Sequence, residues 1–349
     1  MVRYSPAMSR SRHRLVRVLT ALGVAGALLA ALAGPSAALS SGYPTLSSGN
    51  RGVNVRALQH LLRQHRITIA VRVDDTPDDR PMFERRLVTV DGVYGTSTDT
   101  VVREFQRRQG LPVNGRTTPD TWTKLVVSLR PGARGEAVAA LQRLLIEKRH
   151  ADLDVNATFD TVTRSAVVRF QRHVGLEATG SVGSATWRRL LAHLEQPVFG
   201  SILCPYEVGN GSAKWGTSEA IGQIQAAAGR VAAAGHGKVG IGDISWEHGG
   251  DIPLHQTHEQ GLDVDIRAMR DAKDQCRSGV RWDWSTYDRA ATRALVRAIR
   301  ATAPGHIKVI YFNDPVLIRE GLVTWFEGHD DHIHVRYCQV VHALSTYDC

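Results

Sequence analysis

The sequence lacks several features that would place it in common classes of protein. Its first 38 residues contain no acidic residue, and no apolar stretch after residue 34 is long enough to span a membrane. Only four cysteines occur among 349 residues, none of them before residue 204, and no two have the close spacing of a cysteine-ligated zinc site. These absences argue against a protein with several membrane spans and against a zinc finger.

The beginning of the chain is positively charged and then apolar. Five arginines precede the run from Val18 to Gly34, and the small residues of "GPSAA" follow it. This order predicts a secretory signal over residues 1–38 that is cleaved after Ala38, and therefore a secreted protein with no membrane span once the signal is removed. An uncleaved membrane anchor is the alternative, because the run is near the shortest length that spans a bilayer.

Net charge and cysteine content indicate which binding partners and which cellular compartment the protein can have. The formal net charge is +9, and cleavage of the signal removes five positive charges and leaves +4. This mild excess suits an anionic cell-wall surface and predicts no nucleic-acid partner. An even number of cysteines in a secreted chain predicts two disulfides, with three connectivities open. The cysteines are Cys204, Cys276, Cys338 and Cys349.

A repeated pattern follows a short linker at residues 39–45. Both copies contain an opening Gly, a Leu-Gln, a Phe-Gln, a Gly-Leu and a Thr-Trp-x-x-Leu, in the same order. Apolar residues recur at helical spacing, as in "VNVRALQHLL" and "EAVAALQRLL", so each copy is predicted to be a three-helix, all-α domain. The copies span residues 46–127 and 128–196. The first is 18 residues longer between its Leu-Gln and Phe-Gln, and alternation in "ITIAVRV" predicts an inserted β-hairpin there.

These shared motifs resemble the peptidoglycan-binding domain found on many bacterial wall hydrolases. The resemblance implies that peptidoglycan is a partner and that the protein is associated with the cell wall. The second copy departs from the pattern, because it has Phe159-Asp160 where the first has Tyr94-Gly95. Its fold is expected to be the same, while its ligand binding is left open, as is the oligomeric state of the protein.

Residues 197–349 have a different character. Helical stretches alternate with short apolar runs such as "KVGIGDI" and "HIKVIYF", which predicts an α+β domain, here expected to have an antiparallel sheet core. A helix is predicted from Tyr287 to Arg300, with Ser285 and Asp288 at its start. The whole chain is therefore expected to be multidomain, with two helical domains followed by an α+β domain.

Two stretches of this last part concentrate histidine and aspartate. In "HEQGLDVDI", Asp263 and Asp265 alternate with apolar residues, which predicts a strand with one acidic face and His258 on the loop before it. In "HIHV", His332 and His334 would project from one face of another strand. His, His and Asp together suit Zn²⁺, and three protein ligands leave a fourth position for water. Bound zinc lowers the pKa of that water to about 7 and polarises a carbonyl. The spacing leaves open which histidine is a ligand and which is a base.

These two motifs are similar to those of the penicillin-insensitive murein endopeptidases, a group of zinc peptidases related to the lysostaphin-type and D-Ala-D-Ala-type enzymes. The resemblance covers residues from about 200 to 349 and implies a zinc-dependent hydrolase of peptidoglycan cross-links. It also implies that His258, Asp265 and His334 hold the zinc. The base implied is His332, with His329 beside it.

Two further residues of the motifs have open roles. His255 could assist substrate binding, take a second metal, or donate a hydrogen bond to a ligand. Asp263 could orient a ligand or bind an amine of the substrate. Two other functions are open as well: a D-alanyl-D-alanine carboxypeptidase of the same chemistry, and a wall-binding protein without activity. The intact motifs argue against the second of these.

Overall fold

The computed structural model describes residues 42–73, 82–206, 211, 213–253 and 255–349. The predicted secretory signal, residues 1–38, lies outside the described residues, as do residues 39–41 of the predicted linker and the tip of the predicted hairpin. Within the described ranges, no helix is long and apolar enough to cross a membrane.

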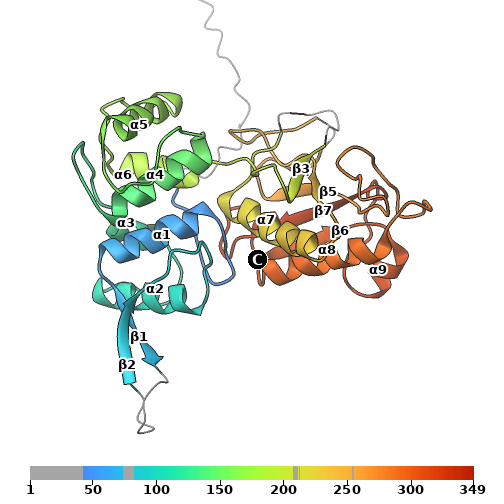
Figure 1. Cartoon of the computed structure of the whole chain (residues 1–349), viewed down its shortest axis with the longest axis horizontal. Helices are drawn as coiled ribbons and strands as arrows, with labels where there is room; N and C mark the ends of the chain where they lie inside the picture. The colour runs from blue at the N-terminus through green and yellow to red at the C-terminus, as the bar shows by residue number, and fades with distance from the viewer. Residues whose placement is uncertain (1–41, 74–81, 207–210, 212, 254) are drawn as a thin grey trace, which may run out of the picture. The chain divides into compact units, whose positions relative to one another are not determined.

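Helices make up most of the region that contains the two repeats (Figure 1). Repeat 1 contains a β-hairpin of antiparallel strands between its first two helices, as predicted. The described helices are α1 (Val53–Gln64), α2 (Thr96–Arg108) and α3 (Pro119–Leu125) in repeat 1, then α4 (Glu136–Arg149), α5 (Thr161–His173) and α6 (Ser184–Ala192) in repeat 2. The hairpin strands are β1 (Thr68–Val73) and β2 (Met82–Leu87).

The two repeats share one hydrophobic core. The sequence predicts a three-helix domain for each copy, but the buried apolar residues of both copies form a single cluster in which α1 packs against α4. Leu58 and Leu141 are fully buried in it, and so are Trp122 and Trp187. Each repeat thus buries one apolar side of its first helix against the first helix of the other repeat.

The departure from the repeat pattern at Asp160 has a local explanation. Asp160 is the N-cap of α5, and its side chain accepts a hydrogen bond from the backbone N–H of Thr163. Gly95 holds the same position before α2 and offers no side chain for capping. Its backbone is extended, a conformation open to any residue. The aspartate therefore preserves the fold and adds a helix cap.

A five-stranded sheet forms the centre of the region after residue 197, in the order β3-β4-β5-β7-β6. The sequence predicts an antiparallel sheet, but the observed sheet is mixed, because β3 runs parallel to β4 at one edge. The other three pairings are antiparallel. The strands are β3 (Leu203–Pro205), β4 (Val239–Ile241), β5 (Asp263–Arg267), β6 (Ile307–Tyr311) and β7 (His332–Tyr337).

Helices α7 (Ser218–Ala233) and α8 (Arg289–Thr302) pack against each other and share a core with the sheet (Figure 1). Helix α8 begins two residues later than predicted. Asp288 is its N-cap and accepts a hydrogen bond from the N–H of Ala291, so the aspartate ends the preceding loop instead of lying in the first turn. A short helix, α9 (Pro315–Arg319), follows β6.

Alternation along β5 and β7 gives the sheet one apolar and one polar face. Val264 and Ile266 of β5, with Ile333 and Val335 of β7, are fully buried in the core that α7 and α8 complete. Because side chains alternate along a strand, the aspartates of β5 and the histidines of β7 project from the opposite face. This polar face contains the residues that the sequence singles out.

Both predicted disulfides are formed, between Cys204 and Cys276 and between Cys338 and Cys349. They close loops with sequence separations of 72 and 11 residues. Replacing both cysteines of the shorter loop by serine should lower the free energy of unfolding by about 2–3 kcal/mol, and the same change in the longer loop by about 4 kcal/mol. Urea unfolding of the two double variants tests this order. A larger loss for the shorter loop would contradict an explanation based on loop closure alone.

Candidate metal centre

The register of β5 and β7 brings the two sequence motifs together. Asp265 lies directly opposite His334, and Arg267 lies opposite His332. Opposed residues of an antiparallel pair have neighbouring side chains, so the aspartate and the histidine meet on the polar face of the sheet. His258, on the loop before β5, completes a buried group with them.

Three donor atoms of this group form a nearly equilateral triangle. His258 Nε2 is 3.2 Å from His334 Nδ1, His334 Nδ1 is 3.1 Å from Asp265 Oδ1, and His258 Nε2 is 3.4 Å from Asp265 Oδ1. Ligand atoms about 2.0–2.1 Å from a tetrahedral ion lie about 3.3–3.4 Å apart. The three atoms therefore have the spacing of one face of a tetrahedral metal site.

The other nitrogen of each imidazole is engaged by an oxygen acceptor. His258 Nδ1 is 3.1 Å from the backbone carbonyl of Ile244, and His334 Nε2 is 2.8 Å from Asp263 Oδ1. If these nitrogens carry the protons, His258 Nε2 and His334 Nδ1 are left as lone-pair donors. Such contacts fix the tautomer and the ring orientation of metal-binding histidines.

The buried carboxylate of Asp263 accepts four hydrogen bonds next to this triangle. Its Oδ1 accepts hydrogen bonds from His334 Nε2 and from Arg336 Nε, at 2.8 and 2.7 Å. Its Oδ2 accepts from the hydroxyl of Tyr347 at 2.6 Å and from the backbone N–H of His258 at 3.2 Å. A carboxylate has about four lone-pair positions, and all four contacts of Asp263 are within the protein. The geometry thus favours an orienting role for Asp263 over binding of a substrate amine.

The loop that presents His258 has an unusual backbone. His258 has φ of +79°, in the left-handed region that costs free energy for residues other than glycine. Three residues later, Gly261 has φ of +70°, and a Cβ there would lie 3.1 Å from the Cα of Gly216 and from the nitrogen of Thr217. Glycine is thus required at this turn. The hydrogen bond from His258 N–H to Asp263 helps to hold the strained residue in place.

Buried carboxylates dominate the electrostatics of the group. Burial lowers the pKa of His334, but its hydrogen bonds to Asp263 and Asp265 and the charges of these carboxylates outweigh burial and raise the pKa to about 9. Burial raises the pKa of Asp265, yet the charge of His258 and hydrogen bonds from His258 and His334 hold it well below the usual value. The field that stabilises a proton on His334 would equally stabilise a cation.

His332 and His329 lie beside the triangle. His332 Nδ1–H donates to Asp331 at 2.8 Å, and its Nε2 is 3.8 Å from Asp265 Oδ1. The ring of His329 is 4.8 Å from that of His332 and 5.4 Å from that of His334. Burial and the neighbouring charge of His332 lower the pKa of His329 to about 4. Both histidines thus lie close enough to the donor triangle to exchange a proton with a group bound there.

His255 lies near the other carboxylate oxygen of Asp265. Its Nε2 is 3.1 Å from Asp243 Oδ2 and its Nδ1 is 3.9 Å from Asp265 Oδ2. One ligand atom each from His255, His258 and Asp265 lie within 4.8 Å of one another, so these residues also form a group that could hold a metal ion. The side chain of His255 is about one-fifth exposed, whereas the side chain of His258 is buried.

Comparisons with protein families agree with this arrangement. Residues 51–125 and 134–190 each match the family model of a putative peptidoglycan binding domain. Residues 210–303 match the penicillin-insensitive murein endopeptidase family. The order of the domains is the one that the sequence predicts, and together they support a hydrolase of the bacterial cell wall. Among curated proteins, none matches the chain.

The endopeptidase match contains only part of the donor triangle. It includes His255, His258 and Asp265, and it ends before the strand that bears His332 and His334. His332 and His334 lie outside the matched residues, and the pairing of β7 with β5 brings them to the site.

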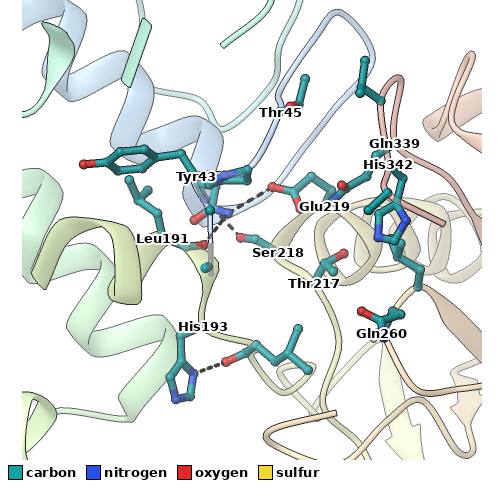
Figure 2. Close-up of a pocket in the computed structure, with 18 of the residues that line it drawn as sticks. Tyr43, Thr45, Leu191, His193, Thr217, Ser218, Glu219, Gln260, Gln339 and His342 are labelled. Carbon is teal, nitrogen blue, oxygen red and sulfur yellow. Dashed lines mark hydrogen bonds between the residues drawn. The ribbon is translucent and has the colours of Figure 1, made fainter. Parts of the chain in front are cut away.

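A cavity of about 530 Å³ lies elsewhere, between the repeats and the region after residue 197, which is called the endopeptidase region below (Figure 2). Asn54 of α1 donates hydrogen bonds there to the carbonyl of Leu191 and to Glu219 Oε1 of α7. Gln260 and Leu262 line the cavity, but His258, Asp265 and His334 do not. The cavity is therefore separate from the donor triangle.

Sequence reasoning missed several residues that position the cluster. Asp243, which contacts His255 and the ammonium of Lys214, lies in "IGDIS", outside the two histidine and aspartate motifs. Tyr347 lies near the end of the chain, where nothing in the local pattern marks it. It reaches Asp263 because the Cys338–Cys349 disulfide holds the last residues near the end of β7.

Proposed function

We propose that the protein is a secreted, zinc-dependent peptidoglycan hydrolase that cleaves peptide cross-links, with the two repeats holding it on the cell wall. The observation that carries the proposal is the triangle of His258 Nε2, His334 Nδ1 and Asp265 Oδ1, with sides of 3.1–3.4 Å. Two imidazoles and one carboxylate are a donor set that zinc accepts in hydrolases. The family matches support the substrate, and the two disulfides support an oxidising, extracytoplasmic location.

The residues of the cluster divide into ligands and supporting groups. His258, Asp265 and His334 would hold the zinc, which when bound supplies positive charge to polarise the scissile carbonyl and to acidify a water. His332 would accept a proton through Nε2, because its Nδ1–H is fixed on Asp331. Asp263 would orient His334 and the loop of His258. His329 and His255 lie beside the donor triangle and would contact the substrate.

Aromatic side chains near His329 suit the binding of a substrate strand. Phe326 is 45% exposed, and its ring is 5.5 Å from that of His329 and 4.7 Å from that of Tyr311. Trp325, beside it in the chain, is 61% exposed. Exposed aromatic rings next to a polar cluster are typical of surfaces that hold a ligand.

Digestion of purified, cross-linked peptidoglycan tests the proposed reaction. We expect the protein to release muropeptides whose masses correspond to opened cross-links, and a chelator to abolish this release. Loss of a terminal D-alanine without opened cross-links would instead indicate a carboxypeptidase. The chelated protein should still sediment with insoluble wall, because wall binding is assigned to the repeats and not to the metal. Release of muropeptides at an undiminished rate after complete removal of metal would refute the proposed chemistry.

A further inference from the structure

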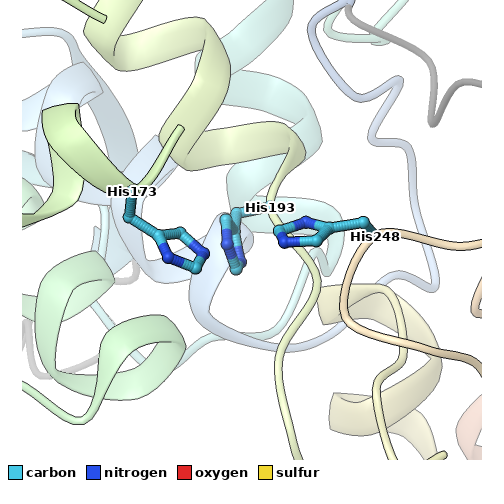
Figure 3. A group of neighbouring side chains, drawn as sticks. All are labelled: His173, His193 and His248. Atoms are coloured by element: carbon cyan, nitrogen blue, oxygen red, sulfur yellow. The ribbon is translucent and has the colours of Figure 1, made fainter. Parts of the chain in front are cut away.

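A second group of histidines lies outside the cluster described above. His173 ends α5, His193 follows α6, and His248 lies on the loop after β4 (Figure 3). One ligand atom from each lies within 4.8 Å of the other two. The ring centroids of His173 and His193 are 5.6 Å apart, and those of His173 and His248 are 5.4 Å apart. The C-terminal ends of two helices of repeat 2 and one loop of the region after residue 197 thus meet at three imidazoles.

The buried member of the group has the tautomer that a metal ligand needs. His193 Nδ1 is 2.6 Å from the carbonyl of Leu194, so Nδ1 carries the proton and Nε2 keeps its lone pair. Burial lowers the pKa of His193 to about 4 and also lowers that of His173. Neutral imidazoles are the form that binds metal.

A carboxylate lies beside two of the three rings. Glu247 Oε1 is 3.0 Å from His173 Nε2 and 3.7 Å from His193 Nε2. Glu247 also forms an ion pair with Arg149, which lies 3.5 Å from His193 Nε2. The arginine competes with a cation for this carboxylate, so the group should bind metal more weakly than the donor triangle does.

We propose that His173, His193 and His248 form a second metal site, with Glu247 as its carboxylate, that takes a divalent ion with a preference for imidazole, such as Zn²⁺. The donors must close from within 4.8 Å to about 3.3 Å for such an ion. His173 and His248 are exposed, so rotation of their side chains can close the site around an ion that arrives from solvent. The ion would cross-link repeat 2 to the loop that follows β4. It would therefore stabilise the arrangement in which the repeats and the endopeptidase region are in contact.

Titration of the full chain with Zn²⁺, followed by calorimetry and metal analysis, tests the second site. His173→Asn and His248→Asn should each bind one Zn²⁺ fewer than the unmodified chain. His150→Asn is the matched control: it removes an exposed histidine outside the group and should bind as much Zn²⁺ as the unmodified chain. Zn²⁺ should also raise the unfolding temperature of the unmodified chain more than that of His248→Asn.

The comparison counts a difference between variants, so it holds whether or not the donor triangle is catalytic. Digestion of peptidoglycan by His248→Asn should continue, because neither His173 nor His248 belongs to the proposed active site. An unchanged number of bound Zn²⁺ ions in both His173→Asn and His248→Asn would overturn the second site and leave the proposed function untouched.

Discussion

His334→Ala should lose the zinc of the donor triangle and its activity on peptidoglycan, whereas His332→Ala should keep this zinc and lose rate. In His334→Ala only His258 and Asp265 would remain of the donor triangle, and two protein ligands hold zinc poorly. In His332→Ala the triangle is intact, but the imidazole whose Nε2 lies 3.8 Å from Asp265 is gone. The cleavage rate should then fall by roughly 10²–10⁴, the usual contribution of a positioned acid–base group.

Zinc content and cleavage rate must be measured on the same samples of the two variants. His236→Ala is a suitable control, since this half-buried histidine lies between α7 and β4 and should change neither quantity. Zinc loss in His332→Ala together with zinc retention in His334→Ala would reverse the two roles.

Asp263→Asn should weaken zinc binding by roughly 10–100-fold, the usual effect of removing an outer partner of a metal-binding histidine. The amide keeps the size of the carboxylate but loses its charge, and its nitrogen cannot accept a hydrogen bond. Of the four donors that now meet Asp263, those of Arg336 and His334 would lose a charged partner, and the His258 loop could lose its anchor.

Competition with a chromogenic chelator measures the zinc affinity of Asp263→Asn. Asp271→Asn, which changes an exposed aspartate after β5, is the matched control. Equal affinities for the two variants would mean that the hydrogen bonds to Asp263 do not support the metal, and the orienting role would have to be abandoned.

Residue patterns within single elements predicted their structures well. Alternation in "ITIAVRV" indicated the hairpin, and alternation in "LDVDI" indicated β5 with Asp263 and Asp265 on one face. The start of α8 was misplaced by two residues, because an aspartate favours both the N-cap and the first turn, and only the backbone geometry separates the two. The three-residue strand β3 is too short to show a period, so its parallel pairing with β4 could not be anticipated.

Apart from the grouping that the family resemblance implied, contacts between distant segments could not be predicted from the sequence. The motif resemblance named His258, Asp265 and His334, and the structure brings these three together, while their roles stay predictions. The group of His173, His193 and His248 has no common motif, because its members come from two regions of different fold and meet only through tertiary packing. Local patterns therefore describe elements, while the surroundings of a site depend on register and on contacts between regions.

The common core of α1 and α4 limits how the two repeats could act together on the cell wall. Modules on a flexible linker gain avidity from the linker, which lets the second module search for its ligand. Here the domains cannot separate without exposing the leucines and tryptophans that they bury together. Bivalent attachment then requires ligands whose spacing matches that of the two domains. If both domains bind peptidoglycan, the pair should bind more tightly to wall regions in which the distance between neighbouring strands matches the distance between the two domains. Elsewhere the protein should attach through one domain alone.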